Sequence, residues 1–302
     1  MLNNVIVAAY VIMAVLIFCF QVIDFMKAKK ENRLETDTSY VKTGAVGFFC
    51  LFFDVLGIGC FSTITFLLTA FKLVPDKQIP GTLNVSTALS APIFALLFFT
   101  KTDVDPVTLI ILTACAAVGA YFGAKIVSGM SELKVQLSMG IAMLIAAGFV
   151  LLGQLNLMPV GGNALGLGGI KLLIASVTLL IVGALANLGV GPWAPTMAIL
   201  FFLGISPIVC YPICYALSAF QQPISSIKFI KEDAYNRKAS ASITVCGCVS
   251  ATLAFFIAVS LPTYALKWIV FFIVLYTGLR MFYSYGKTKE KRMQPHKGSN
   301  PC

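Results

Sequence analysis

The sequence has few charged residues and a single histidine, and both shortages exclude classes of protein. Asp, Glu, Lys and Arg make up 11% of the chain, against about 25% in an ordinary soluble domain. The only histidine is His296, close to the C-terminus. The apolar segments contain no HExxH motif, no P-loop and no Ser-His-Asp set, so we predict no enzyme, no catalytic residue, no cofactor and no metal site.

The nine cysteines do not form a zinc or redox motif either. Cys210 and Cys214 are four residues apart, and Cys246 and Cys248 are two apart, so neither pair is a CxxC. Most of the cysteines lie in apolar segments, where free cysteine behaves as a small hydrophobic residue.

What the sequence has in abundance is apolar residues. They make up 59% of the chain, and the mean hydropathy is +0.91, more than a soluble core can use. The net charge of +10 comes from residues between the apolar segments and in the tail, which is the positive-inside pattern and not a nucleic-acid surface. We therefore predict an all-α polytopic protein of the plasma membrane.

Several apolar segments have the length of one membrane crossing. They are residues 5–25, 79–100, 106–126, 133–154, 207–227, 240–260 and 265–285. No Lys or Arg precedes the first of them, while Lys27, Lys29, Lys30 and Arg33 follow it. This asymmetry predicts an accessory first helix with the N-terminus outside and the C-terminus in the cytoplasm.

Residues 44–70 form a different kind of apolar segment, which contains Asp54 and a Leu-Gly-Ile-Gly break at residues 56–59. Each arm of roughly 13 residues would be about 20 Å long as helix, too short to cross a hydrocarbon core of about 30 Å. Such glycine-interrupted segments are typical of discontinuous or re-entrant helices in transporters, where unwound backbone can bind an ion.

The break occurs a second time, in residues 183–203, and the two halves align at one constant offset. The aligned pairs are Gly57 with Gly189, Gly59 with Gly191, Pro75 with Pro207, Pro80 with Pro212, and Ser86 with Ser218. Because these residues punctuate helices, the match is more informative than one between Leu and Val. The sequence predicts two homologous transmembrane repeats, 43–154 and 171–285. They are flanked by an N-terminal helix and basic loop (1–42), joined by a linker (155–170), and followed by a basic, disordered tail (286–302).

At these residues the chain resembles the TauE/SafE sulfite exporter family, also called the TSUP (toluene sulfonate uptake permease) family. That family carries a glycine-rich break in each half, then a proline, then a helix with a Thr-Ser pair. The matching residues here are Leu56-Gly57-Ile58-Gly59, Pro75 and Ser86-Thr87 in the first half, and Leu188-Gly189-Val190-Gly191, Pro207 and Leu217-Ser218 in the second. The resemblance covers roughly residues 42–285, with Cys60-Phe61 and Pro192-Trp193 where the family has further glycines.

Two topologies can be compared by their charges. If each broken segment crosses the membrane, Lys72, Lys77, Lys125 and Lys134 fall outside. If each is a re-entrant hairpin, those four lysines lie inside with the other basic loops, and Lys101, Lys171 and Lys267 lie outside. The hairpin topology suits the positive-inside rule better. It gives each half three crossings, so the halves would be inverted repeats.

Asp54 is the only carboxylate deep in the repeated segments. An ionised carboxylate in hydrocarbon costs about 2.5 kcal/mol or more, so it must be protonated, paired or in contact with water. Two interpretations stay open. Asp54 either couples transport to a proton or cation, or has a structural role, through a hydrogen bond to a helix end or an interfacial position.

The second arms of the broken segments begin at Cys60-Phe61-Ser62 and at Pro192-Trp193-Ala194. A helix N-terminus has unpaired N–H groups and a partial positive charge, so two such ends could hold an anion without buried lysines. The alternative is that the glycines only permit close helix packing. The predicted substrate-binding residues at the breaks are Gly57, Gly59, Cys60, Gly189, Gly191 and Pro192.

Polar residues at a similar depth could donate hydrogen bonds to anion oxygens. They are Asn84, Ser86, Thr87, Ser218, Gln221 and Gln222. Hydrogen bonding between helices is the alternative role for each of them.

The resemblance implies a permease for a small sulfur-containing anion, such as sulfite, thiosulfate or an organosulfonate, in a lipid bilayer and without nucleic acid as a partner. Transport of another small anion is the alternative, and a membrane enzyme or receptor subunit is a distant one. The anion, the direction, the coupling ion and the oligomeric state stay open at this stage.

Overall fold

The structure is a computed structural model that describes residues 2–54, 60–99, 104–157, 161–189, 191–257 and 263–293. Within these ranges nearly all residues are helical, and the only β pairing is an isolated bridge between Ala164 and Ile205. The predicted all-α fold class is confirmed.

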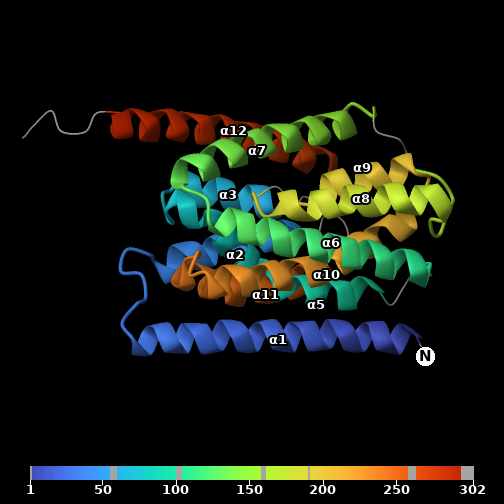
Figure 1. The fold of residues 1–302 in the computed structure, drawn as a ribbon, viewed down its shortest axis with the longest axis horizontal. Helices are drawn as coiled ribbons and strands as arrows, with labels where there is room; N and C mark the ends of the chain where they lie inside the picture. The colour runs from blue at the N-terminus through green and yellow to red at the C-terminus, as the bar shows by residue number, and fades with distance from the viewer. Residues whose placement is uncertain are drawn as a thin grey trace, which may run out of the picture.

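The helices run nearly parallel to one long axis, with α1 at one edge of the bundle and α7 and α12 at the other (Figure 1). In chain order they are α1 (Leu2–Lys30), α2 (Tyr40–Asp54), α3 (Cys60–Ala70), the 3-10 turn η1 (Asp76–Gln78), α4 (Ile79–Thr87), α5 (Ser90–Phe99), α6 (Pro106–Ser128), α7 (Glu132–Gln154), α8 (Gly169–Ala186), α9 (Trp193–Phe202), α10 (Pro207–Lys231), α11 (Arg237–Ile257) and α12 (Thr263–Met293).

Six candidate spans among the described residues are long and apolar enough to cross a membrane. They are Val5–Lys30, Asp76–Leu97, Pro106–Ser128, Glu132–Gln154, Gly169–Ala186 and Arg237–Phe256. Large apolar side chains such as Phe122 and Ile145 are more than half exposed on these helices. So much exposed apolar surface is matched by lipid and not by water, and the polytopic membrane class is confirmed.

The predicted span 79–100 is divided into α4 and α5, which differs from the expectation of one continuous helix. The turn lies at Ala88 and Leu89. Pro92 has no N–H to donate to the carbonyl of Ala88, and its ring crowds that carbonyl, so the helix breaks one turn before the proline. At the C-terminus, α12 continues to Met293, so residues 286–293 of the predicted tail are helical and not disordered, and the rest of the tail lies outside the described residues.

One end of the bundle, called the basic end from here on, contains the connections 31–39, 71–78, 129–131 and 232–236. Hydrogen bonds and a shared cavity join them. Asn236 Nδ2 donates to Thr38 Oγ1 at 2.8 Å, and Gln136 Nε2 donates to Asp76 Oδ2 at 2.8 Å. The opposite end contains the connections 104–105, 161–168 and 203–206, joined by backbone bonds such as Gly162 N to Ile205 O at 3.2 Å.

Both broken segments are hairpins. The cavity at the basic end is lined both by the loop that precedes α2 and by Thr69 and Lys72 at the end of α3, so α2 leaves this end and α3 returns to it. At the opposite end, Lys171 Nζ in the first turn of α8 donates to Leu203 O just after α9. Figure 1 shows the first hairpin on the left and α9 on the right. The structure therefore has the hairpin topology.

The two hairpins enter from opposite ends, which is the arrangement that inverted repeats require. The other helix contacts fit the same symmetry, in which α2 corresponds to α8, α6 to α11 and α7 to α12. The contact of α2 with α11 corresponds to that of α8 with α6, and the contact of α7 with α12 corresponds to itself. The homology of the two halves stays a prediction from the matched residues.

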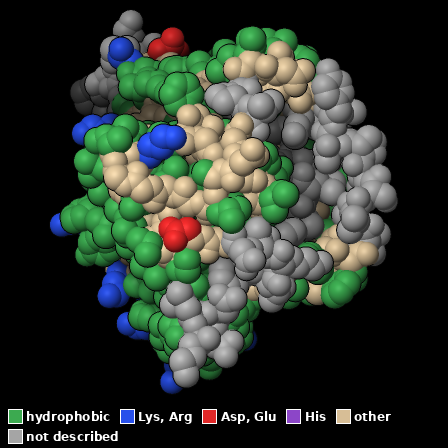
Figure 2. All heavy atoms as spheres, turned by 90° about the vertical axis from the view of Figure 1, so that its right-hand side faces the viewer, with side chains coloured by type: hydrophobic (Ala, Val, Ile, Leu, Met, Phe, Trp, Pro, Cys, Tyr) green, Lys and Arg blue, Asp and Glu red, His purple; other side chains and the backbone are tan. Residues whose placement is uncertain are grey.

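The positive charge is strongly asymmetric between the two ends. Lysines and arginines that flank the connections of the basic end include Lys30, Arg33, Lys72, Lys77, Lys125, Lys134 and Lys231. Figure 2 looks onto the opposite end, where hydrophobic side chains and tan atoms (backbone and uncharged polar side chains) cover most of the described surface, with basic and acidic side chains among them.

Candidate functional site

The second helix break lies against the start of α3, the helix that follows the first break in the sequence. Gly57 and Gly59 lie outside the described residues, but the start of α3 directly follows them. A Cβ built on Gly191 would be 3.6 Å from Cβ of Phe61, and one built on Gly189 would be 3.4 Å from Oγ1 of Thr65. Gly189 has φ +83°, a left-handed conformation that glycine adopts without a steric penalty. The second break therefore runs beside the first turns of α3.

Asp54 caps the helix on the far side of the first break. Its Oδ1 accepts a hydrogen bond of 2.7 Å from the backbone N–H of Cys60, the first residue of α3. The Cys60 side chain interacts with the same carboxylate. A carboxylate in this position satisfies an N–H group that has no partner within the helix and lies in the favourable field of the helix N-terminus. The structural interpretation of Asp54 is thus observed, and its coupling role stays a prediction.

The polar residues predicted on the first half bond to their own helix. Asn84 Nδ2 donates to Pro80 O at 2.9 Å, and the hydroxyls of Ser86 and Thr87 both donate to Leu83 O. Bonds of this local kind satisfy the side chain without any partner from another element. These donors are not presented to a ligand in this conformation.

The polar residues predicted on α10 have a different environment. Ser218, Gln221 and Gln222 are at most 6% exposed, and one side-chain oxygen of each has no hydrogen-bond partner among the described residues. They lie between two contacts with the second break. Tyr215 packs edge-on against Trp193 at 4.6 Å between ring centroids, at the start of α9.

The second contact is at the end of α8, where Asn187 follows the last helical residue. Asn187 Nδ2 and Ser225 Oγ on α10 both donate to Ala120 O, at 3.0 and 3.4 Å. The α10 segment between Tyr215 and Ser225 therefore runs along the second break. Buried polar atoms without partners are costly, so their concentration beside a break indicates a place where a polar ligand or water can bind.

Two further residues of this cluster, Asn187 and Thr196, were not among the predicted site residues. Asn187 is fully buried with Oδ1 unpartnered, and Thr196 in the first turn of α9 is 2% exposed with Oγ1 unpartnered, again among the described residues. Their position in the sequence could have identified them, because both are polar and lie within five residues of Gly189 or Gly191.

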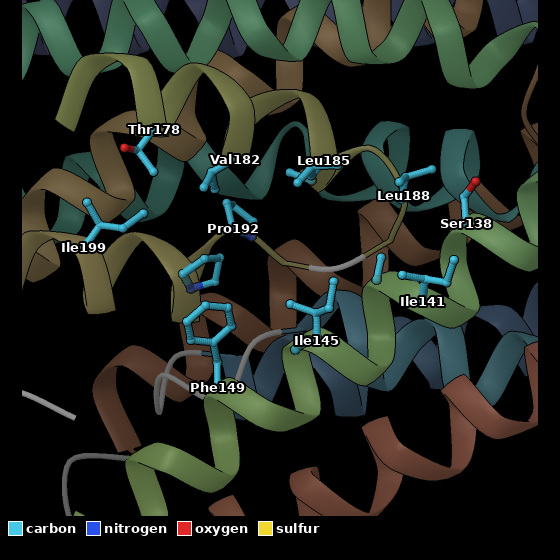
Figure 3. Close-up of a pocket in the computed structure, with 14 residues that line it drawn as sticks. Ser138, Ile141, Ile145, Phe149, Thr178, Val182, Leu185, Leu188, Pro192 and Ile199 are labelled. Carbon is cyan, nitrogen blue, oxygen red and sulfur yellow. The ribbon is translucent and has the colours of Figure 1, made fainter. Parts of the chain in front are cut away.

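Pro192 is the N-cap of α9, one position earlier than the first helical residue. It lines an apolar cleft of about 530 Å³ between α7, α8 and α9. In Figure 3, Val182 and Leu185 border this cleft from α8, and Ile145 and Phe149 border it from α7. Among the described residues that line it, only Ser138 and Thr178 have polar side chains, so the cleft offers few hydrogen-bond donors to an anion.

A second, polar cavity of about 740 Å³ opens at the basic end. Its lining includes charged residues of both signs, among them Lys72, Asp76, Glu132 and Arg280. Thr69 and Gln136 belong to its lining although they are only 5% and 1% exposed, so they mark its inner wall.

A multi-pass helical bundle with two opposed broken hairpins and polar atoms buried beside a break has the architecture of a membrane transporter. Among the described residues no group of His, Cys, Asp and Glu is arranged to hold a metal ion.

The sequence model of the family described as Sulfite exporter TauE/SafE matches residues 1–151. The chain belongs to the TauE/SafE sulfite exporter family. The match begins at residue 1, so it includes α1, which the sequence analysis placed outside the family core, and it ends within α7. No curated protein and no solved structure matches the chain.

Proposed function

We propose that this protein moves a small sulfur-containing anion, such as sulfite, thiosulfate or an organosulfonate, across the plasma membrane, and that the anion binds where the two breaks meet. The observation that carries the proposal is the hydrogen bond between the Asp54 carboxylate and the Cys60 N–H. It means that the N-terminus of α3 holds an oxyanion group supplied by the chain itself.

A sulfite or sulfonate group has the same kind of acceptor oxygen as that carboxylate. The α3 N-terminus can therefore bind it by the same N–H group and the same helix field. The hydroxyls of Ser218 on α10 and Thr196 on α9 have no partner among the described residues, so they can donate to the anion without a buried lysine. The unpartnered amide oxygens of Gln221 and Asn187 are acceptors, and they can bind water beside the anion.

The geometry also supports proton coupling, because two negative charges would compete for one helix end. An ionised Asp54 beside a bound anion would repel it, by about 4 kcal/mol at 4 Å for an effective dielectric constant of 20. Protonation of Asp54 removes that repulsion and weakens its bond to the Cys60 N–H. In this mechanism the anion enters as Asp54 takes up a proton, and both leave together.

Replacement of Asp54 tests the coupling. Asp54→Asn mimics the neutral acid, so anion binding should be kept while the pH dependence of transport is lost. Unchanged pH dependence would make Asp54 purely structural. A sodium requirement that disappears in the same variant would instead identify the carboxylate as a cation ligand.

The substrate class is tested by binding of sulfite, thiosulfate, taurine and acetate to the purified protein, measured side by side. The proposal predicts that a sulfur oxyanion binds more tightly than acetate. Preference for acetate would support the alternative, a transporter of another small anion.

Orientation follows from the charges. The basic end lies in the cytoplasm by the positive-inside rule. This orientation puts the N-terminus outside and the C-terminal end of α12 inside.

A further inference from the structure

The polar cavity at the basic end ends close to the second break. Its inner wall includes Thr69 on α3 and Gln136 on α7. Gln136 holds Asp76 through its amide nitrogen at 2.8 Å, but its amide oxygen has no partner among the described residues. This amide oxygen is buried, so an unpartnered acceptor lies just behind the inner wall of the cavity.

One helical turn further in, the path is closed by side chains. Thr65 lies four residues before Thr69, and Met139 lies three residues after Gln136; both are fully buried. Together with Leu83 of α4 they surround Gly189. From a Cβ built on Gly189, the distances are 2.8 Å to Met139 Cε, 3.1 Å to Leu83 Cδ1 and 3.4 Å to Thr65 Oγ1.

We propose that the polar cavity is the cytoplasmic vestibule of the transport pathway and that Met139, Leu83 and Thr65 form a plug against Gly189 which separates it from the two breaks. The inference rests on the proposed transport function and adds to it a gate. The plug is one turn thick, about 5.4 Å along a helix, so a small displacement would connect the vestibule with the start of α3.

The chemistry of the plug suits a movable barrier. The contacts with Gly189 are made by the flexible ends of Met139 and Leu83, and methionine has three rotatable bonds and adapts to irregular spaces. The Thr65 hydroxyl is bonded to Phe61 O at 2.7 Å on its own helix, so opening breaks no hydrogen bond between helices at this residue. Gly189 has no side chain to obstruct the passage, and its φ of +83° disfavours any other residue there.

The apolar cleft on the other side of the second break does not offer an equivalent route. No charged side chain lines it, so an anion in it would be poorly solvated. An anion that approaches from the basic end therefore passes through the vestibule and the plug.

Cysteine accessibility tests the plug in full-length protein in which the nine native cysteines have been replaced and transport is retained. A charged, membrane-impermeant thiol reagent is added from the cytoplasmic side. We expect Gln136→Cys to react rapidly and Thr65→Cys slowly while Met139 is present. Combining Thr65→Cys with Met139→Ala should raise its reaction rate by about tenfold or more, as when a minor open state becomes a major one.

Two controls keep the result specific. Met139→Leu refills the space and should keep the slow reaction of Thr65→Cys. Ile141 lies on the same helix, is 47% exposed and lines the apolar cleft, so Ile141→Cys should remain unreactive to the charged reagent in both backgrounds. Rapid reaction of Thr65→Cys with Met139 in place would show that no plug exists. A slow reaction that Met139→Ala leaves unchanged would show that the cavity is a dead end.

The labelling does not depend on the identity of the substrate. If the protein moves none of the tested anions but shows the Met139-dependent labelling, the proposed function is refuted and the gate is still supported. A protein that transports sulfite with labelling independent of Met139 would refute the gate and leave the proposed function.

Discussion

At the scale of single residues, carboxylates inside the bundle and at its ends have different hydrogen-bond partners. Asp54 is bonded to a helix N-terminus, so its charge is met by backbone dipoles and not by a cation. At the basic end, Asp24 of α1 accepts bonds from Arg237 Nε at 2.8 Å and from Tyr235 at 2.6 Å. This cluster attaches α1, most of whose surface is exposed to lipid, to the start of α11.

Removal of Asp24 should destabilise the fold. Arg237 is 6% exposed, so in Asp24→Ala a buried guanidinium loses its main partner, and we expect a loss of about 2 kcal/mol in unfolding free energy, measured in detergent. Asp233→Ala is the matched control, because Asp233 pairs with the same arginine but is 57% exposed; it should cost less than about 1 kcal/mol. Equal losses in the two variants would contradict the anchoring role of Asp24.

The sequence identified Asp54 because a lone carboxylate in an apolar run is conspicuous. A hydrogen bond to a helix end was one of its predicted roles, but the sequence could not specify that the N–H of Cys60 is the donor. The roles of Ser86 and Ser218 could not be distinguished either, although they are aligned in the two halves. Ser86 bonds to Leu83 on its own helix, whereas Ser218 Oγ is unpartnered among the described residues.

At the scale of elements, the hairpins are held by helices that approach through glycine. A Cβ on Gly119 of α6 would lie 1.9 Å from Leu180 O of α8, and one on Gly183 of α8 would lie 2.3 Å from Ala116 O. Backbones this close are usual between membrane helices. Lipid gives no hydrophobic driving force for helix association, so the helices are held by close van der Waals packing at small residues. The sequence predicted both breaks from their glycines, but the α4–α5 turn was missed because the effect of Pro92 falls four residues upstream.

An added methyl group should separate the effects of packing and helix propensity. Gly119→Ala must push α6 away from α8, so we expect a loss of about 2 kcal/mol in unfolding free energy. Gly148→Ala on α7 meets nothing within 4 Å and should be neutral or stabilising by up to about 1 kcal/mol. Thermal or denaturant unfolding of both variants in detergent measures the difference. A neutral Gly119→Ala would mean that α6 and α8 are not packed this closely.

At the scale of the whole molecule, the proposed orientation rests on the charges of the basic end, and the hairpin topology rests on the ends at which the arms begin and finish. The distribution of the lysines in the sequence favoured the hairpin topology. The structure has this topology because the first arm of each hairpin begins, and the second arm ends, at the same end of the bundle. The relation between hairpin and vestibule could not be read from the sequence, since the vestibule is assembled from five separate segments of the chain.

Labelling from each side of the membrane tests this orientation. In the cysteine-replaced background, Lys72→Cys and Lys125→Cys should react only with impermeant reagent on the cytoplasmic side. Lys171→Cys, at the opposite end, should react only from outside. Reaction of all three from the same side would contradict the arrangement of the ends.

The central claim is that the meeting point of the two breaks carries a sulfur oxyanion across the membrane. Flux of radiolabelled sulfite into liposomes that contain the purified protein, with a proton gradient of either sign, tests it most directly. We predict a saturable flux that depends on the gradient in the wild type and does not in Asp54→Asn. Folded protein that moves sulfite, thiosulfate and taurine no faster than protein-free liposomes would contradict the account.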